Sequence, residues 1–163
     1  MSTKPWFVPR TSVEQVEEGH DLAPKFDEHG LIPCITTDYA SGEVLMLGYM
    51  NQAALERTIE LGEAVYYSRS RKALWHKGAT SGMTQKDRQM LNDDDQDAVW
   101  LRVEVGGLGA SCHVGYRSCF SRAVPTGEEV ATGDEALELT FTETDKVFDP
   151  VEMYGDAPNP TKL

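Results

Sequence analysis

Residues 31–68 carry the clearest signals of secondary structure and read LIPCITTDYASGEVLMLGYMNQAALERTIELGEAVYYS. Its two apolar segments, 31–38 and 44–49, flank the dipeptide Ser41-Gly42, which is a turn signal. Strand, turn and strand in this order predict a β-hairpin.

The same stretch predicts one helix directly after the hairpin. Asn51 is a favourable N-cap, residues 52–61 are mostly good helix formers, and Gly62 supplies a residue that ends helices. Leu55 and Ile59 are four positions apart and are expected on one face of this helix.

Further elements are short. Strands are predicted at 64–68, at 98–105, where apolar residues alternate, and late in the chain at 137–141. A short helix is predicted around 12–18, and a polar, basic loop at 68–83. Together these elements predict the α+β class, with small mixed or antiparallel sheets and few helices.

The length of 163 residues predicts one folded domain. We expect an N-terminal arm at 1–30, a core at 31–125, and an acidic C-terminal extension at 126–163 that packs at least partly on the core. No apolar run approaches the roughly 18 residues of a membrane span, and the N-terminus lacks the apolar part of a secretion signal. Three cysteines favour a reducing cytoplasm over a disulfide framework.

The formal net charge of −12 argues against binding a nucleic-acid polymer by bulk electrostatics. The charge is uneven, because residues 126–163 carry −8 and residues 68–88 carry +5. The basic segment suits a small phosphorylated nucleotide, which the net charge does not exclude. A solvated surface of mixed charge is the alternative.

Three acidic residues alternate along the chain: Asp93, Asp95 and Asp97. In an extended segment, such residues point to one face, where three carboxylates can hold a hard cation such as Mg²⁺. A flexible acidic turn before the strand at 98–105 is the alternative.

Two thiols and an imidazole lie close in sequence, in Cys112-His113 and Cys119. Zinc takes Cys sulfur and His nitrogen in tetrahedral geometry, and catalytic zinc sites keep one position for water. The alternative is that both cysteines are buried apolar residues and that His113 is a surface or core residue.

The basic segment carries residues suited to a phosphorylated ring. Arg69, Arg71 and Lys77 match phosphate oxygens, and neighbouring glycines allow backbone N–H groups close to an anion. Trp75 can stack on a base, and Ser81 adds a hydroxyl group. A solvated loop with Trp75 in the core is the alternative.

Together, in this order, these segments resemble the phosphoribosyl-AMP cyclohydrolase family of histidine biosynthesis. The match covers roughly residues 31–122. The matching stretches are Gly42-Glu43-Val44-Leu45-Met46, Tyr49-Met50-Asn51, Gly62-Glu63-Ala64, Tyr67-Ser68-Arg69-Ser70-Arg71, Leu74-Trp75 with Lys77-Gly78, Ser81-Gly82, residues 93–97, and Cys112-His113 through Arg117-Ser118-Cys119-Phe120.

The resemblance implies a hydrolase that opens the adenine ring of 1-(5-phosphoribosyl)-AMP at the N1–C6 bond, giving a formimino carboxamide ribonucleotide, ProFAR. It implies an intertwined homodimer in which cysteines of both subunits hold zinc and three aspartates hold Mg²⁺. Carried over, Mg²⁺ falls on the three alternating aspartates and zinc on Cys112 and Cys119. His113 is then the candidate general acid or base for a zinc-activated water, and Arg69, Arg71 and Lys77 the candidate phosphate ligands.

One position departs from the family pattern. Where the family has a zinc-binding cysteine given by the partner subunit, between the first two aspartates, this chain has Asp94. Asp94 can ligate zinc through oxygen, His113 or another group can replace it, or the chain is a non-catalytic, metal-binding relative. We favour the first, because the rest of the site pattern is intact. Cys34, in the first predicted strand, matches no family ligand.

The sequence does not favour two further possibilities, a general nucleotide hydrolase and a fusion with a second enzyme domain. A general nucleotide hydrolase is less favoured because the sequence has no P-loop. Too few residues follow position 122 for the pyrophosphohydrolase domain that often accompanies this family, so we expect a monofunctional chain.

Overall fold

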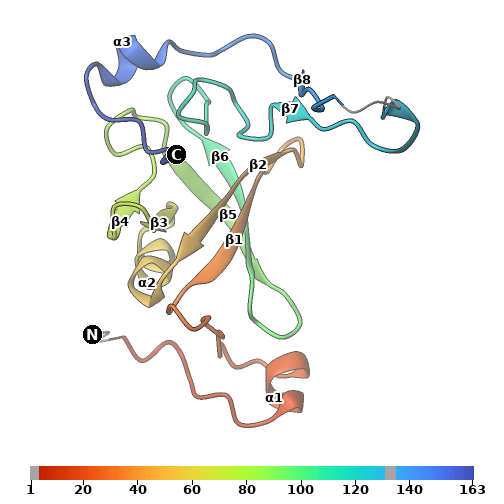
Figure 1. Cartoon of the computed structure of the whole chain (residues 1–163). Coiled ribbons are helices and arrows are strands. Elements are labelled where there is room, and N and C mark those ends of the chain that lie inside the picture. The colour runs from red at the N-terminus through yellow and green to blue at the C-terminus, as the bar shows by residue number, and fades with distance from the viewer. Residues whose placement is uncertain (1–3, 131–134) are drawn as a thin grey trace.

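A four-stranded mixed sheet is the centre of the computed structural model, which describes residues 4–130 and 135–163 (Figure 1). β1 runs antiparallel to β2, as the predicted hairpin, and parallel to β6, while β5 and β6 are antiparallel. The strands are β1 (Ile32–Asp38), β2 (Val44–Met50), β5 (Gln85–Asn92) and β6 (Val99–Val105), in the order β2-β1-β6-β5.

Helix α2 (Gln52–Leu61) begins and ends where the sequence predicts. The Asn51 side chain accepts a hydrogen bond from the backbone N–H of Ala54 at 2.8 Å, and Gly62 ends the helix with φ 69°. Leu55 is buried, whereas Ile59 is 36% exposed. Ile59 lies at the edge of the buried stripe because four residues turn the helix slightly more than one full revolution.

The prediction of a loop at 68–83 is wrong in part, because strand β4 lies within this range. β3 (Val65–Ser68) and β4 (Ala73–His76) form a separate antiparallel hairpin, with Tyr66 opposite Trp75 and Tyr67 opposite Leu74. Aromatic and apolar pairs of this kind stabilise a hairpin. The surrounding basic residues concealed the signal, and β5 was likewise missed because its residues are mostly polar.

Tyr66 links the hairpin to the main sheet through a chain of buried hydrogen bonds. Its hydroxyl group donates to the Gln85 side-chain oxygen at 2.6 Å and accepts from the Thr36 hydroxyl group at 2.6 Å. The Gln85 amide then donates to the Ser111 hydroxyl group at 3.0 Å. A Cβ atom at Gly48 would lie 2.6 Å from the Tyr66 ring, so this position requires glycine. The buried hydrogen-bond chain therefore joins β1, β3 and β5 to residue 111.

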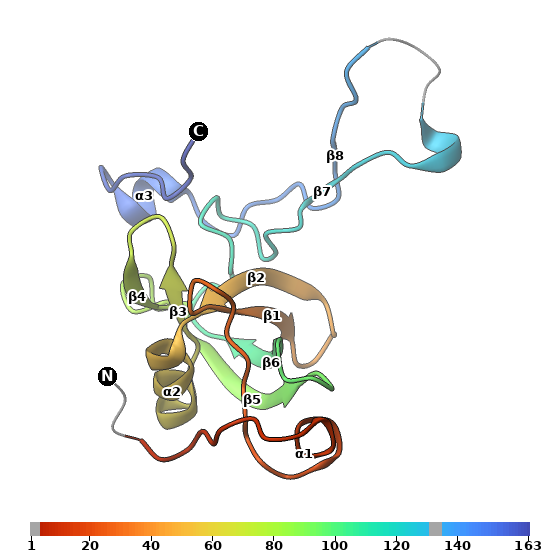
Figure 2. The same ribbon diagram turned by 60° about the horizontal axis from the view of Figure 1, so that its bottom comes forward.

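The outer segments form short elements. These are α1 (Val13–Glu18), β7 (Arg122–Ala123), a 3-10 turn (Gly127–Glu129), β8 (Thr140–Phe141) and α3 (Pro150–Tyr154). The predicted N-terminal helix is confirmed as α1. Of the late strand predicted at 137–141, only β8 forms, and Leu137 and Leu139 stay exposed because the two-residue strands β7 and β8 bury little. Figures 1 and 2 both place α3 close to the β3-β4 hairpin.

The predicted α+β class, with few helices and small, mostly antiparallel sheets, is confirmed. Across residues 4–130 and 135–163, the structure has no helix with the length and apolar character of a membrane span.

Asp87 on β5 is a weak point of this fold. One of its carboxylate oxygens is buried and has no hydrogen-bond partner among the described residues. Burial raises the pKa of Asp87 above its usual value. Folding therefore disfavours the charged form, so the penalty is absent below the unfolded-state pKa and grows as the pH rises through the folded-state pKa.

We expect Asp87→Asn, which removes the charge and keeps the shape, to raise the free energy of unfolding by about 1 kcal/mol at pH 8. This corresponds to a Tm increase of about 2–4 °C, shrinking toward zero below about pH 4. Thermal unfolding across pH measures it, with the exposed Asp145→Asn as the control. An equal effect at every pH would contradict the electrostatic explanation.

Candidate functional site

The two site cysteines lie at the ends of a turn, residues 111–119, which we call the thiol loop. The backbone N–H of Ser111 donates to the Arg117 carbonyl oxygen at 3.0 Å, and that of Cys112 donates to the Tyr116 carbonyl oxygen at 3.1 Å. These bonds fold the loop back on itself. The segment is a turn and not a strand.

Cys112 and Cys119 meet across the thiol loop. The Cys119 backbone N–H donates to the Leu45 carbonyl oxygen on β2 at 2.7 Å, which fixes one end of the loop on the sheet. A hydrogen bond from the Cys119 thiol, helped by the charges of His113 and Lys77 and opposed by burial, lowers the pKa of Cys112 to about 6. The same shared proton raises the pKa of Cys119. The pair therefore presents one thiolate at neutral pH.

Lys77 lies beside the thiols. Its side chain is 7% exposed, donates to the Ser111 carbonyl oxygen, and sits 4.8 Å from the centre of the Trp75 ring. Burial lowers the pKa of Lys77, and the two thiols oppose this shift. Lys77 was predicted as a phosphate ligand from its place in the basic segment, but its side chain lies beside Ser111 and the two thiols and does not line the pocket that holds Arg69.

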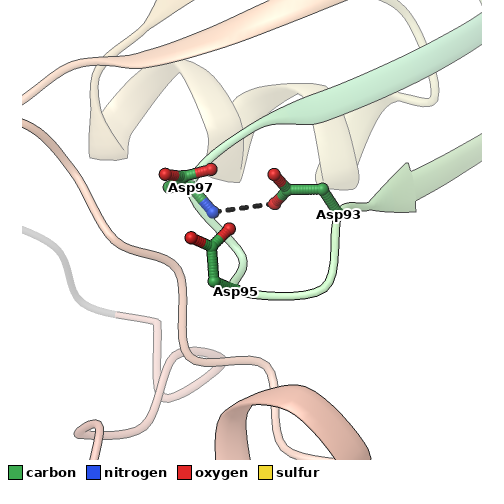
Figure 3. Close-up of side chains that lie close together, drawn as sticks. All are labelled: Asp93, Asp95 and Asp97. Atoms are coloured by element: carbon green, nitrogen blue, oxygen red, sulfur yellow. Dashed lines mark hydrogen bonds between the residues drawn. The ribbon is translucent and has the colours of Figure 1, made fainter. Parts of the chain in front are cut away.

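Asp93, Asp95 and Asp97 form a cluster, the aspartate trio, in the turn between β5 and β6 (Figure 3). One carboxylate oxygen from each lies within 4.8 Å of the others. The three aspartates do not lie on one face of an extended segment, as their alternation predicted, so that reason is wrong. The chain turns here, with Gln96 at φ 58°, and the Asp93 carboxylate accepts from the Asp97 backbone N–H at 2.9 Å.

The aspartate trio shares protons. Hydrogen bonds with Asp93 and Asp95 raise the pKa of Asp97 to about 6. Three carboxylates this close repel one another when all are charged, and a divalent cation would relieve that repulsion in place of the proton. Within the described residues, the trio is the only group of three or more His, Cys, Asp or Glu side chains close enough to hold a metal ion.

Gln96 fixes the turn that carries the aspartate trio, and the sequence did not predict this role. Its buried side chain accepts from the Ala23 backbone N–H at 2.9 Å and donates to the Val16 and Asp21 carbonyl oxygens. The N-terminal arm is thereby tied to the turn. A glutamine between aspartates is typical of an exposed turn, so nothing in the sequence predicted that Gln96 is buried.

A pocket of about 370 Å³ lies beside the β3-β4 hairpin. The Arg69 guanidinium group stacks 4.0 Å from the centre of the Tyr49 ring. The C-terminal extension contributes Pro160 and Lys162, which no sequence motif had marked. The lining residues are Tyr49, Tyr66, Tyr67, Ser68, Arg69, Ser70, Trp75, Pro160 and Lys162.

The remaining candidates lie around this pocket or apart from it. Arg71 stacks 5.5 Å from the centre of the Trp75 ring, and the Ser81 hydroxyl group accepts from the Met83 backbone N–H at 3.2 Å. Asp94 is exposed in the turn of the trio. Cys34 is fully buried in β1, where burial raises its pKa to about 12, so it acts as a core residue.

Comparison with known proteins gives the family. Residues 46–121 match the family model of phosphoribosyl-AMP cyclohydrolase. A phosphoribosyl-AMP cyclohydrolase of Nitrobacter hamburgensis is 51% identical over 147 residues, which covers 90% of this chain and 95% of the relative. This chain belongs to the phosphoribosyl-AMP cyclohydrolase family.

Other relatives agree. Proteins of the same name from Bradyrhizobium diazoefficiens and Rhodopseudomonas palustris are 50% and 52% identical over 140 and 141 residues. Each alignment covers 86% of this chain, and 94% and 92% of the relatives. The resemblance noted in the sequence is thereby confirmed, and the chain is assigned to a hydrolase family of histidine biosynthesis. The family model spans the β3-β4 hairpin, the aspartate trio and the thiol loop.

We expect Mg²⁺ to raise the Tm of this cyclohydrolase-family chain, because a cation that binds only the folded aspartate trio stabilises it. At about 100 times Kd the gain is about 2.7 kcal/mol. Asp95→Asn should abolish most of the shift, since it removes one charge from the trio. Asp145→Asn is the control, because it removes one charge from an exposed aspartate that lies outside the trio. Equal shifts in both variants would argue against the trio as the site.

Proposed function

We propose that this chain hydrolyses the N1–C6 bond of 1-(5-phosphoribosyl)-AMP, opening the adenine ring to give ProFAR in L-histidine biosynthesis. The observation that carries the proposal is the meeting of two thiols, one of them acidic, in a chain of this family. The aspartate trio and the arginine-bearing pocket support it. Three free cysteines fit a reducing cytoplasm.

The donor atoms fit the two metals of the proposal. Cys112 ionises readily, and thiolate sulfur is a zinc ligand, whereas the carboxylates of the trio suit Mg²⁺. Bound zinc supplies hydroxide at neutral pH by lowering the pKa of its water from 15.7 to about 7. Lys77, held close to the thiols, offsets part of their negative charge.

His113, next to Cys112, is the proposed general acid and base. It accepts a proton as the water oxygen bonds to C6 of the purine. It returns that proton to N1 as the N1–C6 bond breaks, and the hydroxyl group left on C6 loses its own proton to solvent, so that C6 becomes the carbonyl carbon of a carboxamide. The N1-ribosyl group makes the ring readily protonated, so C6 is already electrophilic.

The pocket is the proposed nucleotide site. Arg69 and Lys162 bring two positive charges to its wall, and Trp75 offers an aromatic face for a ring. Arg71, stacked on Trp75, adds a third charge beside it. Three cations close together suit a substrate with two phosphate groups.

We further propose a homodimer that completes the zinc site. Within the described residues, no third metal-ligating side chain joins Cys112 and Cys119 at metal-binding distance. The exposed face of the sheet also carries an apolar row. Ile35 on β1 pairs with Leu47 on β2 and with Trp100 on β6, and these three side chains are 42%, 48% and 40% exposed. A second copy covering this row would remove it from water and bring its Asp94 to the zinc site.

Turnover of 1-(5-phosphoribosyl)-AMP, followed by the ultraviolet change on ring opening, tests the function. We expect the wild type to turn over, a chelator to stop it, and zinc with Mg²⁺ to restore it. His113→Ala should keep its zinc and lower kcat about 10²–10⁴-fold. A metal-loaded wild type without turnover would favour the alternative that Asp94 suggests, a non-catalytic metal-binding relative.

A charged substitution in the apolar row tests the dimer. We expect Leu47→Glu to give a monomer in sedimentation, because burying an unpaired carboxylate is unfavourable. It should lose zinc and turnover together, if the partner subunit completes the site. Val151→Glu, exposed on α3, is the control. A folded Leu47→Glu monomer with full zinc content would contradict this proposal.

A further inference from the structure

The C-terminal extension contacts the thiol loop directly, although it lies beyond residue 121, where the family model ends. We propose that Glu143 is a positioning residue: its carboxylate holds the thiol loop in the shape in which Cys112 and Cys119 bind one zinc ion. The zinc part rests on the proposed function. The contact itself does not.

Both carboxylate oxygens of Glu143 accept hydrogen bonds from the backbone of the thiol loop. One accepts from the Arg117 backbone N–H at 2.8 Å, and the other from the Ser118 backbone N–H at 3.3 Å. The Glu143 side chain is only 14% exposed, so water competes little for these bonds. Hydrogen bonds from backbone N–H groups to a carboxylate are charge-assisted and stronger than neutral ones.

Arg117 and Ser118, which Glu143 binds, help to fix the positions of both cysteines. Ser118 directly precedes Cys119, and its hydroxyl group donates to the Val44 carbonyl oxygen at 2.7 Å on β2. The Arg117 carbonyl oxygen accepts a hydrogen bond from the backbone N–H of Ser111, the residue before Cys112. Glu143 thus acts on the point where the two arms of the loop meet.

The extension is itself anchored, so Glu143 is presented from a fixed position. The Val147 backbone N–H donates to the Gly115 carbonyl oxygen at 2.7 Å, within the thiol loop. Phe148 is buried against Met83 and Ala110. A Cβ atom at Gly115 would lie 2.4 Å from the Phe148 carbonyl oxygen, so the close approach depends on glycine at that position.

Arg117 adds an ion-pair bridge. Its guanidinium group lies 2.9 Å from the Glu43 carboxylate and 3.4 Å from the Glu143 carboxylate. The bridge balances part of the charge that Glu143 brings to the loop, and it ties the extension to the start of β2.

Zinc makes the shape of the loop matter. A tetrahedral ion with Zn–S bonds of about 2.3 Å needs its two sulfurs about 3.8 Å apart. Groups that orient metal ligands without touching the metal typically change metal affinity about 10–100-fold when they are mutated. Glu143 acts on the backbone of the loop and not on the metal, so this is the range we expect.

Zinc affinity of the full-length protein, measured by competition with a chelator, tests the inference. Glu143→Ala should bind zinc about 10–100-fold more weakly. Glu143→Gln, which keeps one acceptor oxygen, should lose less. Glu152→Ala, exposed in the same extension, is the matched control and should match the wild type.

A second measurement is made on metal-free protein. Amide hydrogen exchange at Arg117 and Ser118, and alkylation of Cys112 and Cys119, should be faster in Glu143→Ala than in the control. Unchanged zinc affinity, exchange and alkylation in a folded variant would overturn the inference. If Glu143→Ala does not fold, Glu143→Gln decides by the same measurements. If the wild type binds no zinc, the proposed metal site fails, and exchange and alkylation alone decide the role of Glu143.

Discussion

A buried chain of hydrogen bonds runs from Thr36 through Tyr66 and Gln85 to Ser111 and joins the sheet, the hairpin and the thiol loop. Each link comes from a different part of the fold: β1, β3, β5 and the start of the thiol loop. Tyr66 is 1% exposed, so every polar atom in the chain needs its partner. The main sheet, the hairpin that lines the pocket, and the cysteines therefore take their relative positions from one set of bonds.

The charge of the molecule is unevenly distributed, so the net charge does not describe its individual regions. The net charge of −12 combines the aspartate trio, an acidic extension and a basic hairpin. Like charges in the trio oppose one another and cost stability unless a cation or a shared proton intervenes. In the extension, by contrast, the negative charge of Glu143 is used on the backbone of the thiol loop. The same sign of charge serves two structural purposes.

Sequence patterns predicted those parts whose signal is local. The caps Asn51 and Gly62 located α2, and apolar runs located β1, β2 and β6. They missed β4 and β5, because these strands are stabilised by pairing partners and not by their own periodicity. The motif spacing named Cys112, Cys119 and the aspartates correctly as neighbours, although the aspartates meet in a turn. Gln96, Glu143 and Lys162 were not marked, because their roles depend on segments distant in sequence.

We propose that a zinc ion joins two subunits at the thiol loop. Anomalous diffraction at the zinc edge, from crystals of the zinc-loaded protein, would locate this ion. We expect one peak per thiol loop, about 2.3 Å from the sulfurs of Cys112 and Cys119 and about 2.1 Å from the carboxylate of Asp94 of the partner subunit. A peak at the aspartate trio alone, or on the two cysteines without an oxygen from the other subunit, would contradict it.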